Sequence, residues 1–96
     1  MKPEIGTKVY CIYREGILVD NVAFLGNESF IIESVGITSY EDCWEWYYEN
    51  YNYNWFTDLE KAKEKLLSIA EEKYEEQLKI EQIDDDWYEL VEVERW

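Results

Sequence analysis

The sequence predicts a small α+β domain in which an antiparallel sheet packs against one long helix. Three observations predict this class. Glycine-containing turns separate strand-like runs in the first third of the chain, a long amphipathic helix pattern follows, and the C-terminal segment is again strand-like. The 96 residues suffice for one modest core. We see no internal repeat, linker or low-complexity tract, so we expect a single acidic domain over residues 1–96.

The first third of the chain has the pattern of three consecutive strands. Residues 8–13, 17–25 and 29–35 are rich in the β-branched and aromatic side chains that favour extended structure. Short segments at 14–16 and 26–28, each with a glycine, supply the turn chemistry between them. Strands joined by such tight turns form an antiparallel meander, which is what we expect here.

The next segment is dominated by aromatic residues, which make up eight of the thirteen positions from 44 to 56. We interpret it as a hairpin that turns at Glu49-Asn50. Alternating positions would then place one set of rings on one face of each strand. The two sets are Trp44, Trp46 and Tyr48, and Tyr51, Tyr53 and Trp55. A short helix beginning at Ser39 is the alternative, because residues 39–42 fit a capping pattern.

A long helix follows, and both its start and its buried face can be seen in the sequence. Residues 57–60 match a capping box, in which the Thr57 hydroxyl accepts from an early backbone N–H and Glu60 reaches back to the cap. No glycine or proline interrupts the pattern, so we expect a helix from residue 58 to about residue 77. Its apolar stripe consists of Leu59, Ala62, Leu66, Ile69, Ala70 and Tyr74.

The last segment has two readings. Residues 78–83 and 87–93 can pair as a hairpin across Asp84, Asp85 and Asp86. Alternatively, Asp84 can cap a short final helix, since Trp87 and the apolar residues after it also fit helical spacing. The β-branched residues near the end favour the strands, so the expected fold carries a C-terminal hairpin or strand.

The charge of the chain excludes several classes of partner. Twenty-three acids against nine bases give a net charge of −14. Binding to nucleic acid relies on cations that displace counterions from phosphate, so direct contact with DNA or RNA is not expected. An anionic membrane surface is disfavoured for the same reason. Because no apolar run resembles a signal peptide or a membrane span, we expect a cytoplasmic protein whose Cys11 and Cys43 are reduced and largely buried.

The sequence shows no recognisable catalytic chemistry. It has no histidine, which removes the commonest general base and the commonest zinc ligand. It also lacks a glycine-rich phosphate loop. The run Asp84-Asp85-Asp86 does not have the spacing of a calcium loop, so we read it as a solvated turn or a helix cap. We therefore expect a protein that is not an enzyme and that needs no cofactor or metal.

Negative charge is concentrated in the aromatic segment, the helix and the C-terminal tail. Residues 41–56 have a net charge of −4, and residues 84–96 have a net charge of −5. On the helix, Glu60, Glu64, Glu71 and Glu75 fall within a sector of about 60°, with Lys61 and Lys65 to one side of it, so we expect a lysine-free acidic ridge roughly 22 Å long. This ridge is either a solvated face or a surface complementary to a basic groove.

Exposed aromatic rings would supply affinity, because Trp and Tyr are favoured at binding hot spots. A core of this size cannot bury all the rings of the aromatic segment, and we expect Tyr51 and Tyr53, which lie among asparagines, to be exposed. The candidate partner-binding residues are then Glu49, Tyr51, Tyr53, Glu60, Glu64, Glu71, Glu75, Glu76, Asp84, Asp85 and Asp86.

The layout resembles small bacterial and phage proteins in which an SH3-like sheet precedes a helix. The matching motifs are residues 9–12 after Gly6, residues 55–57, residues 60–63 and Leu66-Leu67. The resemblance covers roughly residues 5–70 and implies an SH3-like fold without any functional residue. In composition the chain is similar to the short acidic proteins by which phages inhibit host defence, the anti-CRISPR and anti-restriction proteins, many of which mimic nucleic acid. This second resemblance implies a role in the host cytoplasm.

Two functions are therefore expected from the sequence. The first is a non-catalytic acidic inhibitor that occupies a basic, nucleic-acid-binding protein, such as a host defence nuclease, as a DNA mimic does. The alternative is an SH3-like module or adaptor that recognises a peptide or protein through exposed aromatic residues. In both cases the partner is a protein surface.

Overall fold

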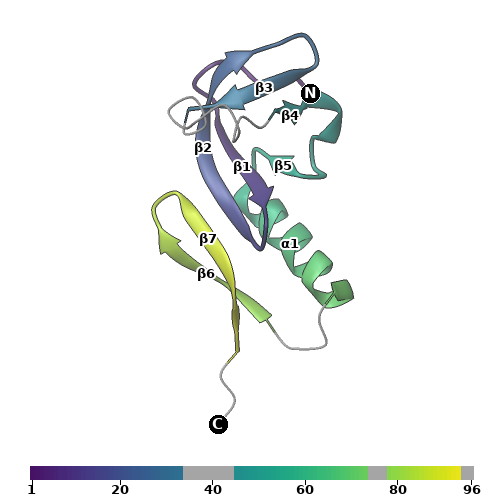
Figure 1. Cartoon of the computed structure of the whole chain (residues 1–96), viewed down its shortest axis with the longest axis vertical. Helices are drawn as coiled ribbons and strands as arrows, with labels where there is room; N and C mark the ends of the chain where they lie inside the picture. The colour runs from purple at the N-terminus through teal and green to yellow at the C-terminus, as the bar shows by residue number, and fades with distance from the viewer. Residues whose placement is uncertain (34–44, 74–77, 94–96) are drawn as a thin grey trace.

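The computed structural model describes residues 1–33, 45–73 and 78–93 of the chain. These residues form a curled antiparallel sheet of seven strands and one α-helix, as Figure 1 shows. The α+β class predicted from the sequence is therefore confirmed. The described residues contain no helix that is both long enough and apolar enough to span a membrane.

The first two strands form the hairpin that the sequence predicts. Strand β1 (Lys8–Tyr13) pairs along its whole length with the first part of β2 (Gly16–Leu25). Arg14 takes a positive φ of 55° in the two-residue turn between them, a conformation that such tight hairpin turns require. Gly16 is buried beneath Trp87, and a side chain at this position would collide with the Trp87 ring and the Tyr88 carbonyl.

Strand β2 is the long central strand of the sheet. One of its edges carries β1, and the other carries two different strands in turn. Its first three residues pair with β7 (Trp87–Glu92), and residues 22–25 pair with β3 (Ser29–Ile32). A register shift between Val22 and Phe24 accompanies the second pairing. The three-strand meander is confirmed as far as Ile32, and the predicted end of the third strand at Val35 lies outside the described residues.

The predicted aromatic hairpin is wrong. Strand β4 (Trp46–Tyr47) pairs with β3, and β5 (Trp55–Phe56) pairs with β1, so the two segments complete opposite edges of the sheet. A 3-10 turn at Tyr48–Asn50 and a loop lead from one to the other. The physical reason is packing. Trp46 and Trp55 are both buried in the same hydrophobic cluster, and they reach it from strands at opposite edges of the sheet. Ser39, the start of the alternative helix, lies outside the described residues, as do Trp44 and Cys43.

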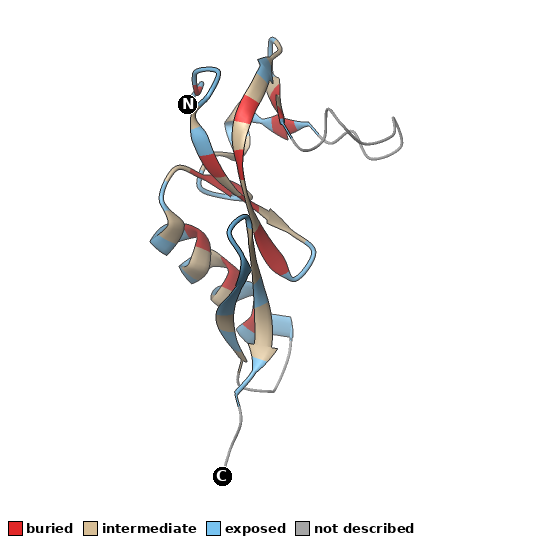
Figure 2. Ribbon diagram, turned by 90° about the vertical axis from the view of Figure 1, so that its left-hand side faces the viewer, coloured by how far each residue is buried: buried red, intermediate tan, exposed pale blue. Residues whose placement is uncertain are grey.

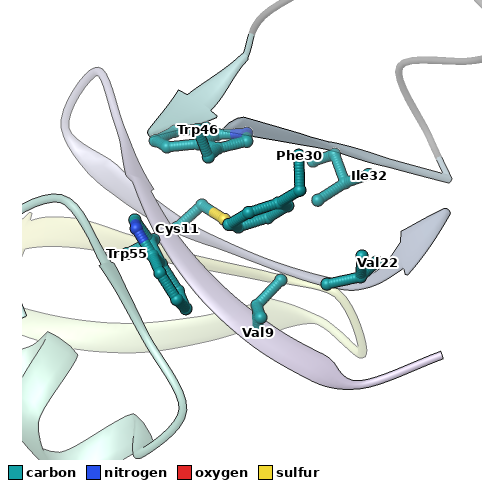
Figure 3. Packing of buried hydrophobic residues seen from close by; sticks show 7 residues of the cluster. All are labelled: Val9, Cys11, Val22, Phe30, Ile32, Trp46 and Trp55. Atoms are coloured by element: carbon teal, nitrogen blue, oxygen red, sulfur yellow. The ribbon is translucent and has the colours of Figure 1, made fainter. Parts of the chain in front are cut away.

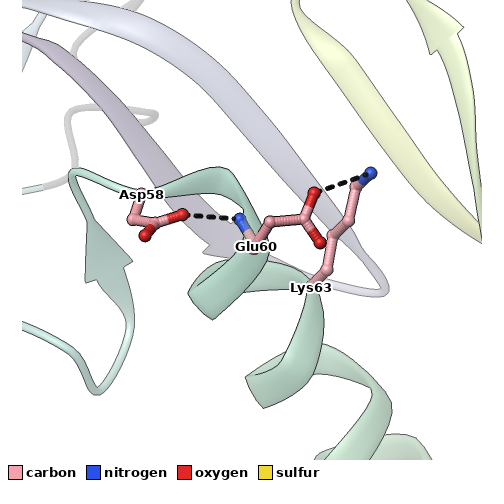
Figure 4. A network of polar contacts seen from close by, with 3 residues as sticks. All are labelled: Asp58, Glu60 and Lys63. Carbon is pink, nitrogen blue, oxygen red and sulfur yellow. Dashed lines mark hydrogen bonds and ion pairs between the residues drawn. The ribbon is translucent and has the colours of Figure 1, made fainter.

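Helix α1 runs over Leu59–Lys73, and the predicted extension to residue 77 falls in a part of the chain that is not described. Ala62, Leu66 and Ala70 are its buried positions. The predicted cap at Thr57 is wrong, because Asp58 Oδ1 accepts the hydrogen bond from the Glu60 backbone N–H at 2.9 Å (Figure 4). The Thr57 hydroxyl instead bonds the Tyr51 hydroxyl at 2.8 Å. Ile69, predicted to be on the apolar stripe, is 37% exposed.

The C-terminal segment is a hairpin, and the alternative helix at this place is wrong. Strand β6 (Leu78–Asp84) pairs antiparallel with β7, and Asp85 and Asp86 form the turn. Pairing of β7 with β2 explains the outcome, because the edge of β2 at Gly16–Leu18 offers backbone hydrogen bonds that a strand can use and a helix could not.

The apolar side chains gather into two clusters, to which alternating positions of β1 and β2 contribute from opposite faces. Figure 2 shows in red where the buried residues lie along the strands and the helix. The sheet cluster, drawn in Figure 3, lies inside the curl of the sheet and contains Val9, Cys11, Val22, Phe30, Ile32, Trp46 and Trp55. In it Phe30 meets Trp55 edge-on, with 4.9 Å between ring centroids. The helix cluster, which joins α1 to the sheet, contains Ile17, Phe56, Ala62 and Leu66.

Candidate functional site

The acidic side chains are almost all on the surface. Every aspartate and glutamate in the described parts of the chain is exposed, apart from Asp20. Asp20 is only 9% exposed, and one of its carboxylate oxygens accepts from the Asn21 backbone N–H at 2.8 Å. Exposed carboxylates keep their hydration and their charge, so the surface as a whole attracts cations.

Several of the basic side chains lie over tyrosine rings. Such cation–π contacts hold a basic group by the charge distribution of the ring, at a distance within about 6 Å of its centroid. The pairs are Lys2 with Tyr48 at 5.8 Å, Arg14 with Tyr13 at 5.0 Å, Lys63 with Tyr88 at 5.3 Å and Lys65 with Tyr53 at 4.8 Å. These basic groups contact uncharged rings, and such contacts neutralise no carboxylate. The net negative charge of the chain is unchanged by them.

The predicted ridge on α1 is not free of lysine. Glu60, Glu64 and Glu71 are exposed on the helix, but Lys63 Nζ lies 3.8 Å from a carboxylate oxygen of Glu60 (Figure 4). Positions three apart are neighbours on a helix surface, which explains the pair. Glu64 in turn lines an open pocket together with Lys61 and Lys65. The first two turns of the ridge are therefore mixed in sign; Glu75 and Glu76 lie outside the described residues.

Three consecutive exposed aspartates lie at the tip of the hairpin, Asp84 at the end of β6 and Asp85 and Asp86 in the turn. Asp84 Oδ1 accepts from the Asp85 backbone N–H at 2.8 Å, and the Asp86 carbonyl accepts from the Val19 N–H at 2.8 Å. These bonds fix the turn against the edge of β2. In the described residues, no group of three potential metal ligands comes together. The turn thus presents three solvated carboxylates on a fixed backbone.

The two tyrosines predicted to be exposed differ from each other. Tyr53 is 62% exposed, as expected. Tyr51 is only half-buried rather than exposed, because its ring packs on Trp55 with 4.7 Å between centroids and its hydroxyl is bonded to Thr57. Tyr51 is therefore part of the support for the sheet cluster, and the expectation that it is free for a partner is wrong.

A pocket of about 290 Å³ lies at the end of the sheet that carries β3 and β4. It is lined by Glu28, Tyr47, Tyr48 and Glu49, of which only Glu49 was predicted. The Tyr48 hydroxyl donates to the Gly26 carbonyl at 2.8 Å, which fixes that wall. Pairing of β3 with β4 places Glu28 and Glu49 around the same pocket, and this long-range arrangement has no signal in the local sequence.

The predicted site residues do not form one surface. Glu49 lies in the turn that follows β4. Strands β3 and β4 lie at one end of the molecule, and the β6–β7 hairpin and the C-terminal part of α1 lie toward the other (Figure 1). The structure therefore presents three separate patches: the acidic pocket at Glu49, the mixed-sign surface of α1 and the acidic hairpin turn. Sequence reasoning also missed Phe24, which is 63% exposed on β2.

The described cysteine does not have the properties of a nucleophile. Cys11 is a free thiol buried in the sheet cluster. Burial raises its pKa far above the usual range, and the negative charge of Asp20 raises it further. A thiol with so high a pKa stays protonated at neutral pH, whereas nucleophilic attack requires the thiolate. Cys11 is therefore a core residue.

Comparison with known proteins gives no relative from which a role can be taken. A scan against protein-family models, a search of curated proteins and a search of solved structures each found no match. The function is therefore argued from the surface of this chain alone.

Proposed function

We propose that the chain is a non-catalytic binding protein that occupies a basic surface of another protein, such as the nucleic-acid-binding groove of a host defence nuclease. One observation carries the proposal: the carboxylates that the structure describes are exposed, except for Asp20, in a chain of net charge −14. A protein keeps such self-repulsion at a cost in stability. Binding to a cationic partner relieves it.

The sign of the charge selects the kind of partner. Clefts that bind nucleic acid are lined with lysine and arginine, so an acidic surface competes for the contacts that phosphates would make. Electrostatic complementarity of this kind mainly raises the association rate and rejects acidic partners. The action that follows is that of a nucleic-acid mimic in the cytoplasm, as in the phage inhibitors that the composition resembles.

Affinity requires apolar anchors as well as charge. Tyr47 and Tyr53 are 43% and 62% exposed. Tyr47 lines the pocket with Glu28 and Glu49, and Tyr53 lies beneath Lys65 at the mixed-sign surface of α1. Aromatic side chains in such positions supply contact area at low cost in conformational entropy. The curled sheet with its following helix also supports an SH3-like fold, a class of small barrel that commonly presents aromatic residues to partners.

The proposal is tested by affinity capture from host lysate followed by a salt gradient. We expect the captured proteins to be basic nucleic-acid-binding proteins that elute as the salt rises from about 0.05 M to 0.5 M, because screening shortens the range of the attraction. Single reversals at Glu49, Glu71 and Asp85 then compare the three patches, each with the same change in net charge. Capture of neutral or acidic proteins that resist the gradient would contradict the proposal.

A second candidate function is recognition of a peptide at the pocket of Glu28, Tyr47, Tyr48 and Glu49. The observation that favours it is the combination of two rings and two carboxylates around one cavity, which suits a cationic side chain. Lys2 of the chain itself already lies over the Tyr48 ring. The variant Tyr47→Ala should then abolish peptide binding, while Tyr53→Ala, an exposed ring elsewhere, should leave it unchanged.

A further inference from the structure

The outer edge of β6 is open in the described parts of the chain. Strand β6 pairs with β7 on one side, and no described strand pairs with its other side. Its residues from Glu81 to Asp84 are exposed. Up to the register shift between Gln82 and Asp84, this open edge presents a row of backbone N–H and C=O groups to which another strand can add.

The hairpin also carries a pair of like charges that the fold leaves directly opposed. Glu81 of β6 lies opposite Glu89 of β7, and both are exposed. Directly opposite side chains in an antiparallel pair have Cβ atoms roughly 5 Å apart and share a face of the sheet, where like charges are destabilising. A cation placed beside Glu81 by a strand added to β6 would offset this repulsion.

An aromatic anchor lies on the same face. The register pairs Trp87 with Leu18 and Glu89 with Gly16, so the Trp87 ring occupies the space above Gly16. Trp87 is half-buried and belongs to neither the sheet cluster nor the helix cluster. A tryptophan outside both cores, bordered by carboxylates, has the character of a binding hot spot with a polar rim.

The charge of the hairpin decides which strand fits. Residues 78–93 contain six acids and one lysine. A second copy of the same edge would bring these acids against one another, which is a known protection of edge strands against self-association. A strand rich in lysine or arginine would be attracted instead, because every second side chain would lie on the face of Glu81 and near the aspartates of the turn.

We propose that the β6 edge binds an extended basic segment of the partner protein as an additional antiparallel or parallel strand. This inference rests on the proposed function, for which it names a binding site and a mode of binding. Backbone hydrogen bonds along β6 supply the affinity, and the Glu81–Glu89 pair and the turn select lysine or arginine. The apolar side chains that alternate with them would lie on the opposite face of the sheet, beside Ile80, which packs against the helix cluster.

The test uses an octapeptide of alternating lysine and valine as the probe. A second octapeptide has the same sequence but carries N-methyl groups on its central backbone amides, so its charge is equal and its hydrogen bonding is lost. We expect the first to bind at least about tenfold more tightly, equivalent to about 1.4 kcal/mol. We also expect it to slow amide hydrogen exchange within Leu78–Asp84. Equal binding of the two peptides would overturn the strand addition.

A matched pair of variants separates the local site from net charge. Glu89→Lys and Glu71→Lys each raise the net charge by two, by replacing an exposed carboxylate with an ammonium group, one in the hairpin and one on α1. We expect Glu89→Lys to weaken probe binding at least about fivefold while raising the free energy of unfolding, since it replaces a like-charge pair by an opposite-charge pair. Glu71→Lys should change probe binding less than twofold.

The possible failures are distinguishable. If both variants weaken binding equally, the attraction is due to net charge alone, which overturns the β6 site and leaves the proposed function intact. Failure of the unmethylated peptide to bind overturns the site as well, and the capture experiment then judges the proposed function independently. Exchange protection of β6 that rises with protein concentration in the absence of peptide would identify a second copy as the occupant, which also overturns the inference.

Discussion

At the scale of single residues, the structure depends on a few close approaches that the side chains around them make necessary. Gly16 is one, because Trp87 lies directly over it. Cys11 is fully buried in the sheet cluster, where the negative charge of the buried Asp20 adds to the effect of burial in raising the pKa of the thiol. The sequence predicts Gly16 as a turn residue. It does not predict that Trp87 covers Gly16, because this contact depends on the pairing of β2 with β7.

Substitution of Gly16 by alanine tests this close approach. The added methyl group would collide with the Trp87 ring and the Tyr88 carbonyl, and the second of these is backbone that cannot rotate away. We expect a loss of about 1–3 kcal/mol in the free energy of unfolding, measured by urea denaturation. Gly26→Ala is the control, because its nearest contact is Ser29 O at 3.1 Å and its loss should be smaller. Equal losses would contradict the close packing at Gly16.

The buried thiol predicts a dependence of stability on pH. The pKa of Cys11 is raised in the folded state from its ordinary value of about 9, so above that pH the unfolded chain releases a proton that the folded chain keeps. The contribution of the buried thiol to the free energy of unfolding is fully present below pH 9. It falls as the pH rises above this value, by up to about 1.4 kcal/mol per pH unit. The variant Cys11→Val should show a weaker fall between pH 8 and pH 10 in urea denaturation. Parallel profiles for the two proteins would refute the assignment.

At the scale of elements, local patterns predicted local structure well. The turn glycines and β-branched runs of the first third led to β1, β2 and β3, and helical periodicity led to α1. The aromatic segment failed, because β4 and β5 pair with strands far away in the sequence and not with each other. The pocket of Glu28 and Glu49 and the position of Trp87 over Gly16 could not be predicted for the same reason, because both depend on strands that pair over long distances in the sequence. An alternating pattern of side chains predicts a strand, but it does not predict which other strand that strand will pair with.

The start of α1 gives a prediction at this scale. Asp58, rather than Thr57, accepts the hydrogen bond of an orphan helical N–H. We expect Asp58→Ala to lower the free energy of unfolding by about 1 kcal/mol, and Asp58→Asn to restore most of the loss, since asparagine is also a good cap. The measurement is thermal or urea denaturation followed by circular dichroism. A variant Asp58→Ala as stable as the original chain would show that the cap contributes nothing.

At the scale of the whole molecule, the dominant fact is uncompensated negative charge on a small α+β frame. The fold distributes the carboxylates over a pocket at one end and a helix and a hairpin at the other. Composition predicts the total charge but not this distribution, and the lysine-free ridge expected on α1 was wrong because Lys63 reaches Glu60. The β6–β7 hairpin is the most acidic of the described segments for its length.

The central claim is that this surface occupies a basic groove that otherwise holds nucleic acid. The direct measurement is displacement of a fluorescent DNA duplex from a purified basic nuclease obtained by the capture experiment, at about 50 mM and 200 mM salt. We predict that the chain displaces the duplex, and that its own affinity falls at least about tenfold between the two salt concentrations, because screening weakens attraction between exposed charges. Binding that leaves the duplex in place, or that is unchanged by salt, would contradict the account.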